Sequence, residues 1–338
     1  MGAMNVVRWG VVGPGRIASK LVRDFPHVPG AEVVSVASRS GERAEAFARE
    51  HGISRWHGSY QAIVEDTGVD VLYIATPHPQ HRAVALAALR AGKGVLVEKS
   101  FTVTPAATRE IVEVARSCGA FAMEAMWTRF FPVIERLRGL VADGALGTVR
   151  AVQADLGVRA PVDPDDRFYS AALGGGALFD VGVYPISFAQ MFLGDPDSVT
   201  ARGSCAPSGV GPSGVDIEEA ILLGHPDGAS ASLFCSLRCA TPGLARVVGT
   251  DGWAEVLPRF HHPDTVVLHR TGHEPERITL PFLGDGYAHE LIEVTTCIAE
   301  GRTESTVMPL AATVSVQDTM GAVADQLGLV PVEGPAQL

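Results

Sequence analysis

The sequence predicts a two-domain protein: an α/β domain built on a parallel sheet, followed by an α+β domain with an open, mainly antiparallel sheet. Two observations predict this fold class. The 338 residues exceed what one compact core usually holds. Strand and helix patterns alternate through the first part of the chain, whereas beyond Gly147 strand patterns follow one another in series. We therefore expect the first domain over residues 5–126 and the second over residues 127–330.

The composition excludes several classes of protein. With 46% hydrophobic and 19% charged residues it is that of a soluble protein, and the net charge of −11 argues against a nucleic-acid partner or an anionic membrane surface. The chain opens without the pattern of a signal peptide, and no apolar run approaches ~18 residues, so we expect no membrane span. The five cysteines form no CxxC pair, which favours reduced thiols of a cytoplasmic protein over disulfides or a zinc site.

A glycine-rich turn follows the first buried-strand pattern and opens a helical one, in the form G-x-G-x-x-A. Gly13 permits the tight turn, Gly15 leaves space for a pyrophosphate, and Ala18 lets helix and strand approach closely. Arg16 and Ile17, at the start of the helix, are further candidate cofactor contacts. The motif in this setting predicts a dinucleotide-binding Rossmann domain.

The end of the second strand indicates which dinucleotide binds. An NAD-selective site usually places Asp or Glu there, on the ribose 2′-hydroxyl. This chain has Ser38 and Arg39 instead, and a hydroxyl with a guanidinium suits a 2′-phosphate. We therefore predict NADP as the cofactor, with NAD less favoured.

Two later strand ends carry further candidate residues. The loop TPHPQH follows the fourth strand at the carboxyl edge of the sheet, where Thr76, Pro77 and His81 are candidate cofactor contacts. A surface histidine at a helix start is an equally good interpretation of His81. The fifth strand ends in Glu98 and Lys99, beside the expected cofactor cleft, although most lysines are simply exposed.

The second half begins at a hinge that contains Trp127 and Arg129. Beyond it, we interpret the polar loop 161–170 as the mouth of a substrate site, and His261 with His262 as part of a solvated loop. Asp251-Gly252 predicts a hairpin turn. Strand patterns lie over 149–157, 198–203, 220–223, 229–237, 245–248 and 265–269, and helical patterns over 287–299 and 310–327.

The stretch GGGALFDVGVYP, residues 174–185, combines flexible glycines with an amphipathic run. Asp180 and Tyr184 lie four residues apart, which places both on one face of a helix. A carboxylate beside a phenol at a helix start suits proton transfer. A capping Asp and a packing Tyr are the alternative interpretation.

Taken together, GVVGPGRIA, TPHPQH, AGKGVLVEK and GGGALFDVGVYPI resemble the glucose-fructose oxidoreductase / inositol dehydrogenase family, Gfo/Idh/MocA, along essentially the whole chain. The segment MEAMWTRFFP and the Asp-x-x-x-Tyr motif resemble its dimeric dihydrodiol dehydrogenases and NADP-dependent sugar dehydrogenases and keto-sugar reductases. The resemblance implies a Rossmann domain followed by a domain with an open antiparallel sheet.

The resemblance also implies roles for individual residues. Lys99 matches the lysine of the family's Glu-Lys-Pro motif, and Asp180 and Tyr184 match the ends of its Asp-x-x-x-Tyr motif. Ser100 replaces the usual proline, which ordinarily stiffens the turn. Tyrosine in place of histidine argues against inositol-type substrates.

The expected chemistry is hydride transfer between a nicotinamide and a carbonyl or secondary alcohol. Tyr184 would donate or accept the proton, Lys99 would lower the pKa of its phenol, and Asp180 would hold a substrate hydroxyl or the lysine. Trp127 would wall the pocket and Arg129 would meet a phosphate or a substrate oxygen, although hinge packing explains both equally well. No metal is required.

The expected substrate is a small molecule, either a sugar or keto-sugar or, as the alternative, a dihydrodiol or dicarbonyl. A non-catalytic nucleotide-sensing regulator on the same fold is the alternative of another class. We also expect a homodimer or higher homo-oligomer formed through the C-terminal sheet, because one face of that sheet would otherwise expose apolar surface.

Overall fold

The computed structural model describes residues 6–161, 163, 166–206 and 215–334. Within these residues the chain forms two compact units. The first contains the described residues up to Met126, the segment Leu283–Val314 and the described residues from Glu333. The second contains the described residues of Trp127–Phe282 and Ser315–Val332. The chain leaves the first unit after Met126 and returns to it at Leu283.

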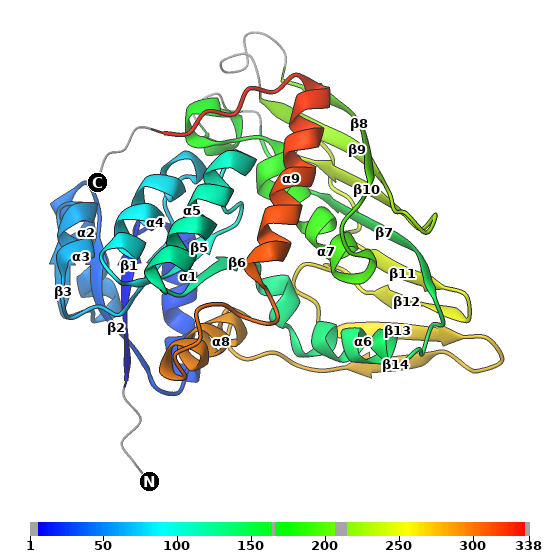
Figure 1. The fold of residues 1–338 in the computed structure, drawn as a ribbon, viewed down its shortest axis with the longest axis horizontal. Helices are drawn as coiled ribbons and strands as arrows, with labels where there is room; N and C mark the ends of the chain where they lie inside the picture. Colours follow the sequence, from blue (N-terminus) through cyan, green and yellow to red (C-terminus); the bar gives the residue numbers. More distant parts are fainter. Residues whose placement is uncertain (1–5, 162, 164–165, 207–214, 335–338) are drawn as a thin grey trace. The chain divides into compact units, whose positions relative to one another are not determined.

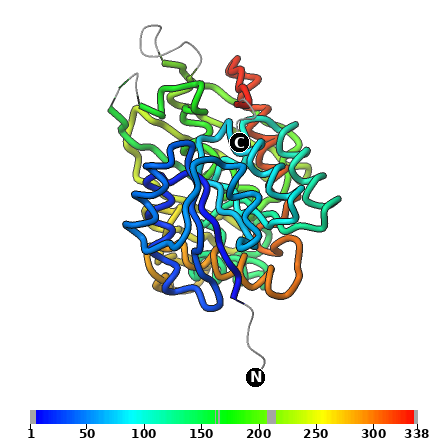
Figure 2. Tube along the Cα trace, turned by 90° about the vertical axis from the view of Figure 1, so that its left-hand side faces the viewer, coloured from blue at the N-terminus to red at the C-terminus, as the bar shows by residue number. Residues whose placement is uncertain are grey.

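The first unit is built on a six-stranded sheet in the order β3-β2-β1-β4-β5-β6, in which all neighbouring strands are parallel (Figure 1). The central strand β1 is the straight dark-blue segment in Figure 2. Sheets of this kind bind ligands beside the carboxyl ends where the strand order reverses, here between β1 and β4. This order confirms the predicted Rossmann fold. The strands are β1 Val7–Val12, β2 Ala31–Ala37, β3 Arg55–His57, β4 Val71–Ile74, β5 Gly94–Glu98 and β6 Ala122–Ala125.

Two helices of this unit, α2 and α5, begin and end where the local sequence supplies caps. The hydroxyl oxygens of Ser40 and Thr104 accept backbone N–H groups at the starts of α2 and α5. Gly52 and Gly119 end the same helices with φ of 68° and 61°, a conformation that glycine adopts at little cost. The helices are α1 Arg16–Asp24, α2 Gly41–His51, α3 Tyr60–Glu65, α4 His81–Arg90, α5 Pro105–Cys118 and α8 Ala288–Ala299.

The core of the first unit lies between the sheet and helices α3, α4 and α5. Leu72 of β4 and Val95 of β5 are fully buried, and Leu89 of α4 and Ile111 of α5 belong to the same apolar cluster. Burying one such side chain contributes roughly 1.5–3 kcal/mol. This packing holds the strands in place, and with them the candidate residues at their carboxyl ends.

A buried carboxylate joins α8 to the first unit. Asp24, at the end of α1, accepts hydrogen bonds from the N–H groups of Asp285, Tyr287 and Ala288 at 2.8, 2.8 and 3.1 Å. These N–H groups belong to the turn that leads into α8 and to its first residue, Ala288, for which no preceding helical turn supplies an acceptor. The sequence analysis assigns residues 288–299 to the second domain because of their place along the chain, whereas they fold with the first unit.

The second unit is built on an eight-stranded sheet in the order β14-β13-β12-β11-β7-β10-β9-β8. β7 and β10 are parallel and the other neighbours are antiparallel, which confirms the predicted sheet type. The predicted hairpin joins β11 to β12, although β12 and β14 themselves are not predicted. The strands are β7 Val149–Gly157, β8 Ser198–Cys205, β9 Asp216–Gly224, β10 Ser230–Ser236, β11 Ala245–Gly249, β12 Gly252–Val256, β13 Thr265–Arg270 and β14 Glu276–Thr279.

Three helices accompany this sheet: α6 Pro132–Ala142, α7 Val183–Leu193 and the later part of α9 Leu310–Leu327. α7 lies along β7 and β10. Gln190 of α7 donates hydrogen bonds to the hydroxyl oxygens of Ser315 and Thr319 of α9, at 3.1 and 2.9 Å. Gln326 completes the pairing of the edge strand β8 by accepting the N–H of Ala201 at 2.9 Å. The site-bearing helix α7 is thus held by both the sheet and α9.

The run Ala171–Leu193 is long and apolar enough to cross a membrane, with a mean hydropathy of 1.3 over its most apolar stretch. Of that stretch, 78% is buried inside the fold, as in the core helix of a soluble protein. The sequence analysis expects no apolar run of about 18 residues, and this run shows that the expectation is wrong. The glycines at 174–176 lie near the start of the run, so they leave the apolar stretch after them uninterrupted.

Candidate active site

The glycine-rich turn between β1 and α1 leaves room for a ligand beside the backbone. Gly13 has a φ of +90°, and a Cβ there would lie 2.8 Å from the carbonyl oxygen of Ala75, so only glycine fits. A Cβ at Gly15 would meet nothing within 4 Å. Gly15 also provides no side-chain cap for α1, so the side chain at the N-cap does not occupy the first N–H groups of the helix. The turn fits the pyrophosphate of a dinucleotide.

The end of β2 carries hydroxyl and guanidinium groups. Ser38 is buried, and its hydroxyl accepts the N–H of Ser40 at 3.2 Å. Burial raises the pKa of Tyr60, and the neighbouring charges of Arg39 and Arg43 lower it, so both guanidinium groups lie near this phenol. Arg43 is thus a second guanidinium group at this end of β2, and the sequence analysis does not name it as a candidate cofactor contact.

Two buried histidines hold the turn that carries Lys99. His78 Nε2 lies 3.1 Å from the carbonyl oxygen of Lys99. His81 Nδ1 lies 3.1 Å from the carbonyl oxygen of Ser100, and its Nε2 lies 2.8 Å from that of Thr76. Burial lowers the pKa of His81 to about 4, so its imidazole is neutral near pH 7. His81 braces the lysine turn, in contrast to the cofactor contact expected from the sequence.

The turn is also held from β6. Glu124 Oε1 accepts the N–H of Phe101 at 3.2 Å, and Ser100 is fully buried. The Lys99–Ser100 peptide bond is cis. Ser100 stands in this turn where the family usually has proline. Contacts from His78, His81 and Glu124 hold the turn instead.

Glu98, the residue before Lys99, belongs to a buried acidic group. Tyr73 donates its hydroxyl to Glu98 Oε1 at 2.5 Å. Burial, together with the charges of Glu98 and Asp24, raises the pKa of Glu290, which favours its neutral form. Glu98 anchors the end of β5, and its predicted contact with the cofactor stays a prediction.

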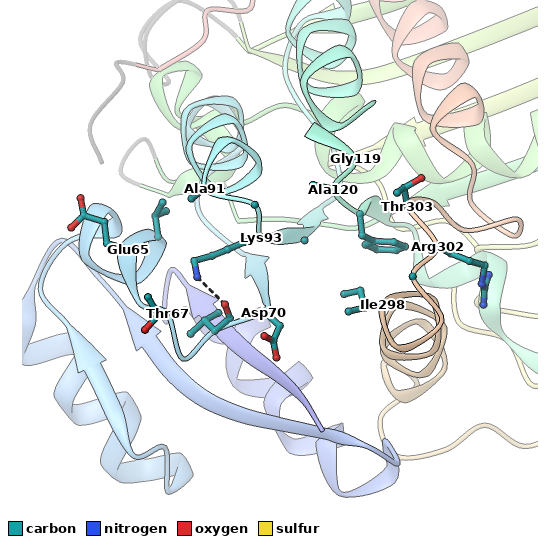
Figure 3. A pocket seen from close by; sticks show the side chains of 16 residues that line it. Glu65, Thr67, Asp70, Ala91, Lys93, Gly119, Ala120, Ile298, Arg302 and Thr303 are labelled. Atoms are coloured by element: carbon teal, nitrogen blue, oxygen red, sulfur yellow. Dashed lines mark hydrogen bonds between the residues drawn. The ribbon is translucent and has the colours of Figure 1, made fainter. Parts of the chain in front are cut away.

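An open hollow of about 600 Å³ lies at the opposite edge of the sheet, against the amino ends of β4, β5 and β6 (Figure 3). Its polar groups already have partners within the protein. Lys93 donates to the carbonyl oxygens of Asp66 and Val69 at 2.6 and 2.8 Å, and Asp70 pairs with Arg8 at 2.6 Å. The candidate cofactor residues lie instead at the carboxyl ends of the strands.

In the second unit, Asp180 and Tyr184 lie on one helical run. Asp180 belongs to a π-helix, Leu178–Gly182, and Tyr184 to the first turn of α7. Asp180 is 3% exposed and Tyr184 is 9% exposed. The helix predicted from their spacing is present, with a widened first turn.

A carboxylate on β9 fixes the start of this run. Asp216 Oδ2 accepts the N–H of Leu178 at 2.6 Å, inside the protein. Gly176 has a φ of +118°, and a Cβ there would collide with Asp216 Oδ1. The glycine is therefore required both by its backbone conformation and by the carboxylate beside it.

A second carboxyl group lies next to Asp216. Burial raises the pKa of Glu219 well above its usual range, and the adjacent Asp216 raises it further. The Cys235 thiol donates to Glu219 Oε2 at 2.5 Å. A Cβ at Gly182 would lie only 2.9 Å from the Cys235 sulfur. Glycine at this position therefore allows the π-helix to pack closely against β10.

Arg167, from the polar loop, pairs with Asp180. Its Nη2 donates to Asp180 Oδ1 at 2.6 Å, and the arginine side chain is 41% exposed where the aspartate is 2% exposed. The guanidinium also lies over the ring of Phe168, 5.0 Å from its centroid. The loop expected to form a substrate mouth thus meets the motif aspartate through an arginine that the sequence analysis did not select.

An aromatic cluster surrounds Tyr184. Its ring centroid lies 5.1 Å from that of His261, and the ring of His262 stacks on Trp127 at 5.6 Å and 17°. His261 and His262 are both partly buried. The sequence analysis expects these histidines to lie in a solvated loop, and this expectation is wrong because they pack against Tyr184 and Trp127. The residues next to them in the sequence do not reveal these contacts.

Arg129 is buried, and its side chain forms hydrogen bonds within the second unit. Its guanidinium donates to the hydroxyl and the carbonyl oxygen of Ser187 on α7, at 3.2 and 3.4 Å. With 4% of its surface exposed, it packs against α7, and its predicted contact with a phosphate or a substrate oxygen stays a prediction.

Comparison with known proteins identifies relatives of this chain. Residues 7–125 match "Oxidoreductase family, NAD-binding Rossmann fold", and residues 134–255 match "GFO/IDH/MocA C-terminal domain". The chain is 36% identical to trans-1,2-dihydrobenzene-1,2-diol dehydrogenase of Bos taurus over 333 residues, covering 96% of this chain and 97% of that protein. The enzyme of the same name from Sus scrofa is 37% identical over 336 residues, with the same coverage.

Solved structures of similar proteins include an aldose oxidoreductase and a ketoreductase. Aldose-aldose oxidoreductase of Caulobacter crescentus superposes with a TM-score of 0.86 at 25% identity, covering 95% of this chain and 97% of that one. KijD10, a 3-ketoreductase from Actinomadura kijaniata, superposes with a TM-score of 0.83 at 28% identity, covering 95% and 98%, in a complex with TDP-benzene and NADP.

The close contact between Gly176 and Asp216 predicts that Gly176→Ala destabilises the protein. The added methyl group must displace Asp216 and adopt an unfavourable φ, so we expect a loss of at least ~2 kcal/mol of stability. Gly52→Ala is the matched control, because Gly52 has a φ of +68° but open space around it, so only the smaller cost of the left-handed conformation applies. Thermal unfolding of both variants checks this, and equal losses would contradict the role given to Asp216.

Proposed function

Because the chain belongs to the Gfo/Idh/MocA family of oxidoreductases, we propose that it uses NADP(H) to interconvert a secondary alcohol and a carbonyl in a sugar, keto-sugar or diol. As a family member it is a nicotinamide-dependent dehydrogenase acting on CH–OH groups. One observation carries the finer proposal. The chain combines a glycine turn open to a dinucleotide with Tyr184, one helical turn beyond the Asp180–Arg167 ion pair.

The end of β2 supports NADP(H) over NAD(H). Ser38, Arg39 and Arg43 supply a hydroxyl and two guanidinium groups, which suit a 2′-phosphate. The similar 3-ketoreductase KijD10 was solved with NADP, which is consistent with this choice. The other residues that we propose to contact the cofactor are Gly13, Gly15, Arg16, Ile17, Thr76, Pro77, Glu98, Lys99 and Trp127.

The nicotinamide supplies or accepts the hydride when bound, and this chain's residues handle the proton. In reduction, the Tyr184 phenol gives its proton to the carbonyl oxygen, and in oxidation it takes the proton of the alcohol. A free phenol titrates near pH ~10, so a positive charge is needed to favour the phenolate near neutrality. We assign that charge to Lys99. Asp180 orients Arg167 toward a substrate hydroxyl.

Variants of a similar enzyme support the choice of these two residues. KijD10 has been studied with a tyrosine changed to phenylalanine and with a lysine changed to alanine or glutamate. Along that chain, the lysine and tyrosine are separated by one residue fewer than Lys99 and Tyr184 are here. The same residue types thus stand at nearly the same separation along the two chains.

A dihydrodiol is the second candidate substrate, because the dihydrodiol dehydrogenases share 36–37% identity along almost the whole chain. A sugar and a trans-diol both present a secondary alcohol beside another hydroxyl, which one polar site can recognise. A panel of aldoses, keto-sugars, trans-dihydrodiols and dicarbonyls, followed by NADPH absorbance, separates the candidates. Absence of turnover across the panel would contradict the proposed substrate class.

The open face of the eight-stranded sheet supports a homodimer. Leu222 is 52% exposed and Trp253 is 43% exposed, and the strand register places both on one face. The Trp253 ring stacks on His269 at 4.4 Å, which presents a flat aromatic surface. Aromatic side chains of this kind dominate the cores of protein interfaces. We infer that two copies associate through this face.

We also propose a cytoplasmic location. All five cysteines are free thiols, and two of them, Cys235 and Cys297, are buried. Burial raises the pKa of both thiols, which keeps them protonated and unreactive. Such thiols are typical of a reducing compartment.

The NADP(H) assignment predicts a selective effect of Arg39→Ala. Loss of one charge-assisted contact costs ~1.5–3 kcal/mol, so the Kd for NADPH should rise roughly ten- to a hundredfold. The Kd for NADH should hardly change, because NADH lacks the 2′-phosphate. Fluorescence titration with both cofactors checks this, and Arg43→Ala should show the same selectivity. Equal losses for both cofactors would contradict the assignment.

Tyr184→Phe should slow the chemical step while leaving cofactor binding intact. General acid catalysis contributes ~10²–10⁴-fold, so kcat should fall by about that factor. Lys99→Met should also lower kcat, and the double variant should be little worse than the poorer single one if the two act as a unit. Steady-state kinetics on the best substrate checks this. An active Tyr184→Phe beside an inactive Lys99→Met would make lysine the acid.

The proposed dimer predicts that Trp253→Arg weakens self-association. Removing an aromatic anchor of an interface costs ~2 kcal/mol or more, so the dimer Kd should rise roughly thirtyfold or more. Trp56→Arg is the matched control, since Trp56 is a similarly exposed tryptophan, at 46%, in the first unit. Light scattering over a micromolar concentration series measures both. A monomeric mass for the unaltered chain would refute the dimer.

A further inference from the structure

The segment Phe260–His262 lies against the helix that carries Tyr184. Phe260 is fully buried, with its ring centroid 5.3 Å from that of Phe188. The next residue, His261, has its ring centroid 5.1 Å from that of Tyr184. Tyr184 and Phe188 are four residues apart on α7, so consecutive residues of the segment meet successive turns of one helix face.

Hydrogen bonds hold the backbone of this segment in place. The N–H of Phe260 donates to the carbonyl oxygen of Gly243 at 2.8 Å. Thr128 donates its hydroxyl to the carbonyl oxygen of His261 at 2.7 Å. The backbone that carries the His261 imidazole is therefore held in place beside Tyr184.

The second histidine extends this surface to Trp127. The rings of His262 and Trp127 are nearly parallel, at 17°, with centroids 5.6 Å apart. His262 Nδ1 and His261 Nε2 lie 3.1 Å apart, within hydrogen-bond distance. Tyr184, His261, His262 and Trp127 thus form a continuous row of contacting rings.

We propose that His261 and His262 are positioning residues for the reaction: His261 fixes the ring of Tyr184, and His262 fixes the indole of Trp127 that walls the substrate site. This inference rests on the proposed role of Tyr184 as proton donor. A phenol that rotates away from the reacting oxygen loses its alignment, and a misplacement of ~1 Å can cost ~10²-fold in rate. The contact with the His261 ring restricts that rotation in the absence of substrate.

The test compares variants that keep or remove the ring contact in the full-length enzyme. His261→Ala removes it, His261→Phe keeps a planar ring against Tyr184, and His262→Ala releases Trp127. His225→Ala is the matched control, because His225 is also buried in the second unit, with Nδ1 3.2 Å from the carbonyl oxygen of Asp195. The measurements are kcat, KM, the Kd for NADPH, the solvent isotope effect on kcat and the melting temperature.

We expect His261→Ala to lower kcat ~10- to 100-fold and to increase the solvent isotope effect, because proton transfer becomes limiting when its donor is misaligned. The Kd for NADPH should stay unchanged, and His261→Phe should recover most of kcat. His262→Ala should raise KM more than it lowers kcat. His225→Ala should affect the melting temperature alone.

Two results would overturn the inference: a kcat of His261→Ala close to that of the unaltered enzyme, or a His261→Phe variant no better than His261→Ala. If His261→Ala is too unstable to assay, His261→Leu replaces it under the same criteria. Tyr184→Phe, measured in parallel, separates the two proposals. An active Tyr184→Phe rejects the proton donor itself, whereas an inactive Tyr184→Phe with an active His261→Ala rejects only the positioning role.

Discussion

The candidate site depends on one buried carboxylate beneath the helical run that carries it. Asp216 reaches from β9 to the N–H of Leu178, and its other oxygen occupies the space that a side chain at Gly176 would need. A carboxylate removed from water is costly unless its oxygens are paired, so this contact strongly constrains where the run can begin. Burial and the adjacent Asp216 raise the pKa of Glu219, which favours its neutral form and so reduces the repulsion between the two acids. The positions of Asp180 and Tyr184 follow from this arrangement.

The parts of the structure predicted from the sequence are those encoded by neighbouring residues. The glycine turn and the strand-to-helix alternation are local signals, and each appears where the sequence indicates. The helical run through Asp180 and Tyr184 likewise follows from a spacing within a few residues. Such features depend on backbone geometry and hydrophobic period, which a single segment can reveal.

The features missed by sequence reasoning join residues that are distant along the chain. Arg167 meets Asp180, and His261 meets Tyr184, only because the fold brings their segments together. His81 is a helix-start residue by sequence, but three backbone carbonyl oxygens and full burial make it a brace for the lysine turn. A histidine or arginine in a polar loop has the same local sequence whether it is solvated or packed, so only the tertiary structure separates these cases.

The order of segments along the chain limits how such an enzyme can diversify. The nucleotide-binding unit is assembled from both ends of the sequence, and α9 begins in one unit and ends in the other. A gene fusion cut at residue 126 would leave α8 behind and expose the carboxylate of Asp24 without the N–H groups that it binds. The two units are therefore not interchangeable modules. New substrate ranges would arise more readily by replacing surface loops, such as the one that carries Arg167, than by shuffling whole domains.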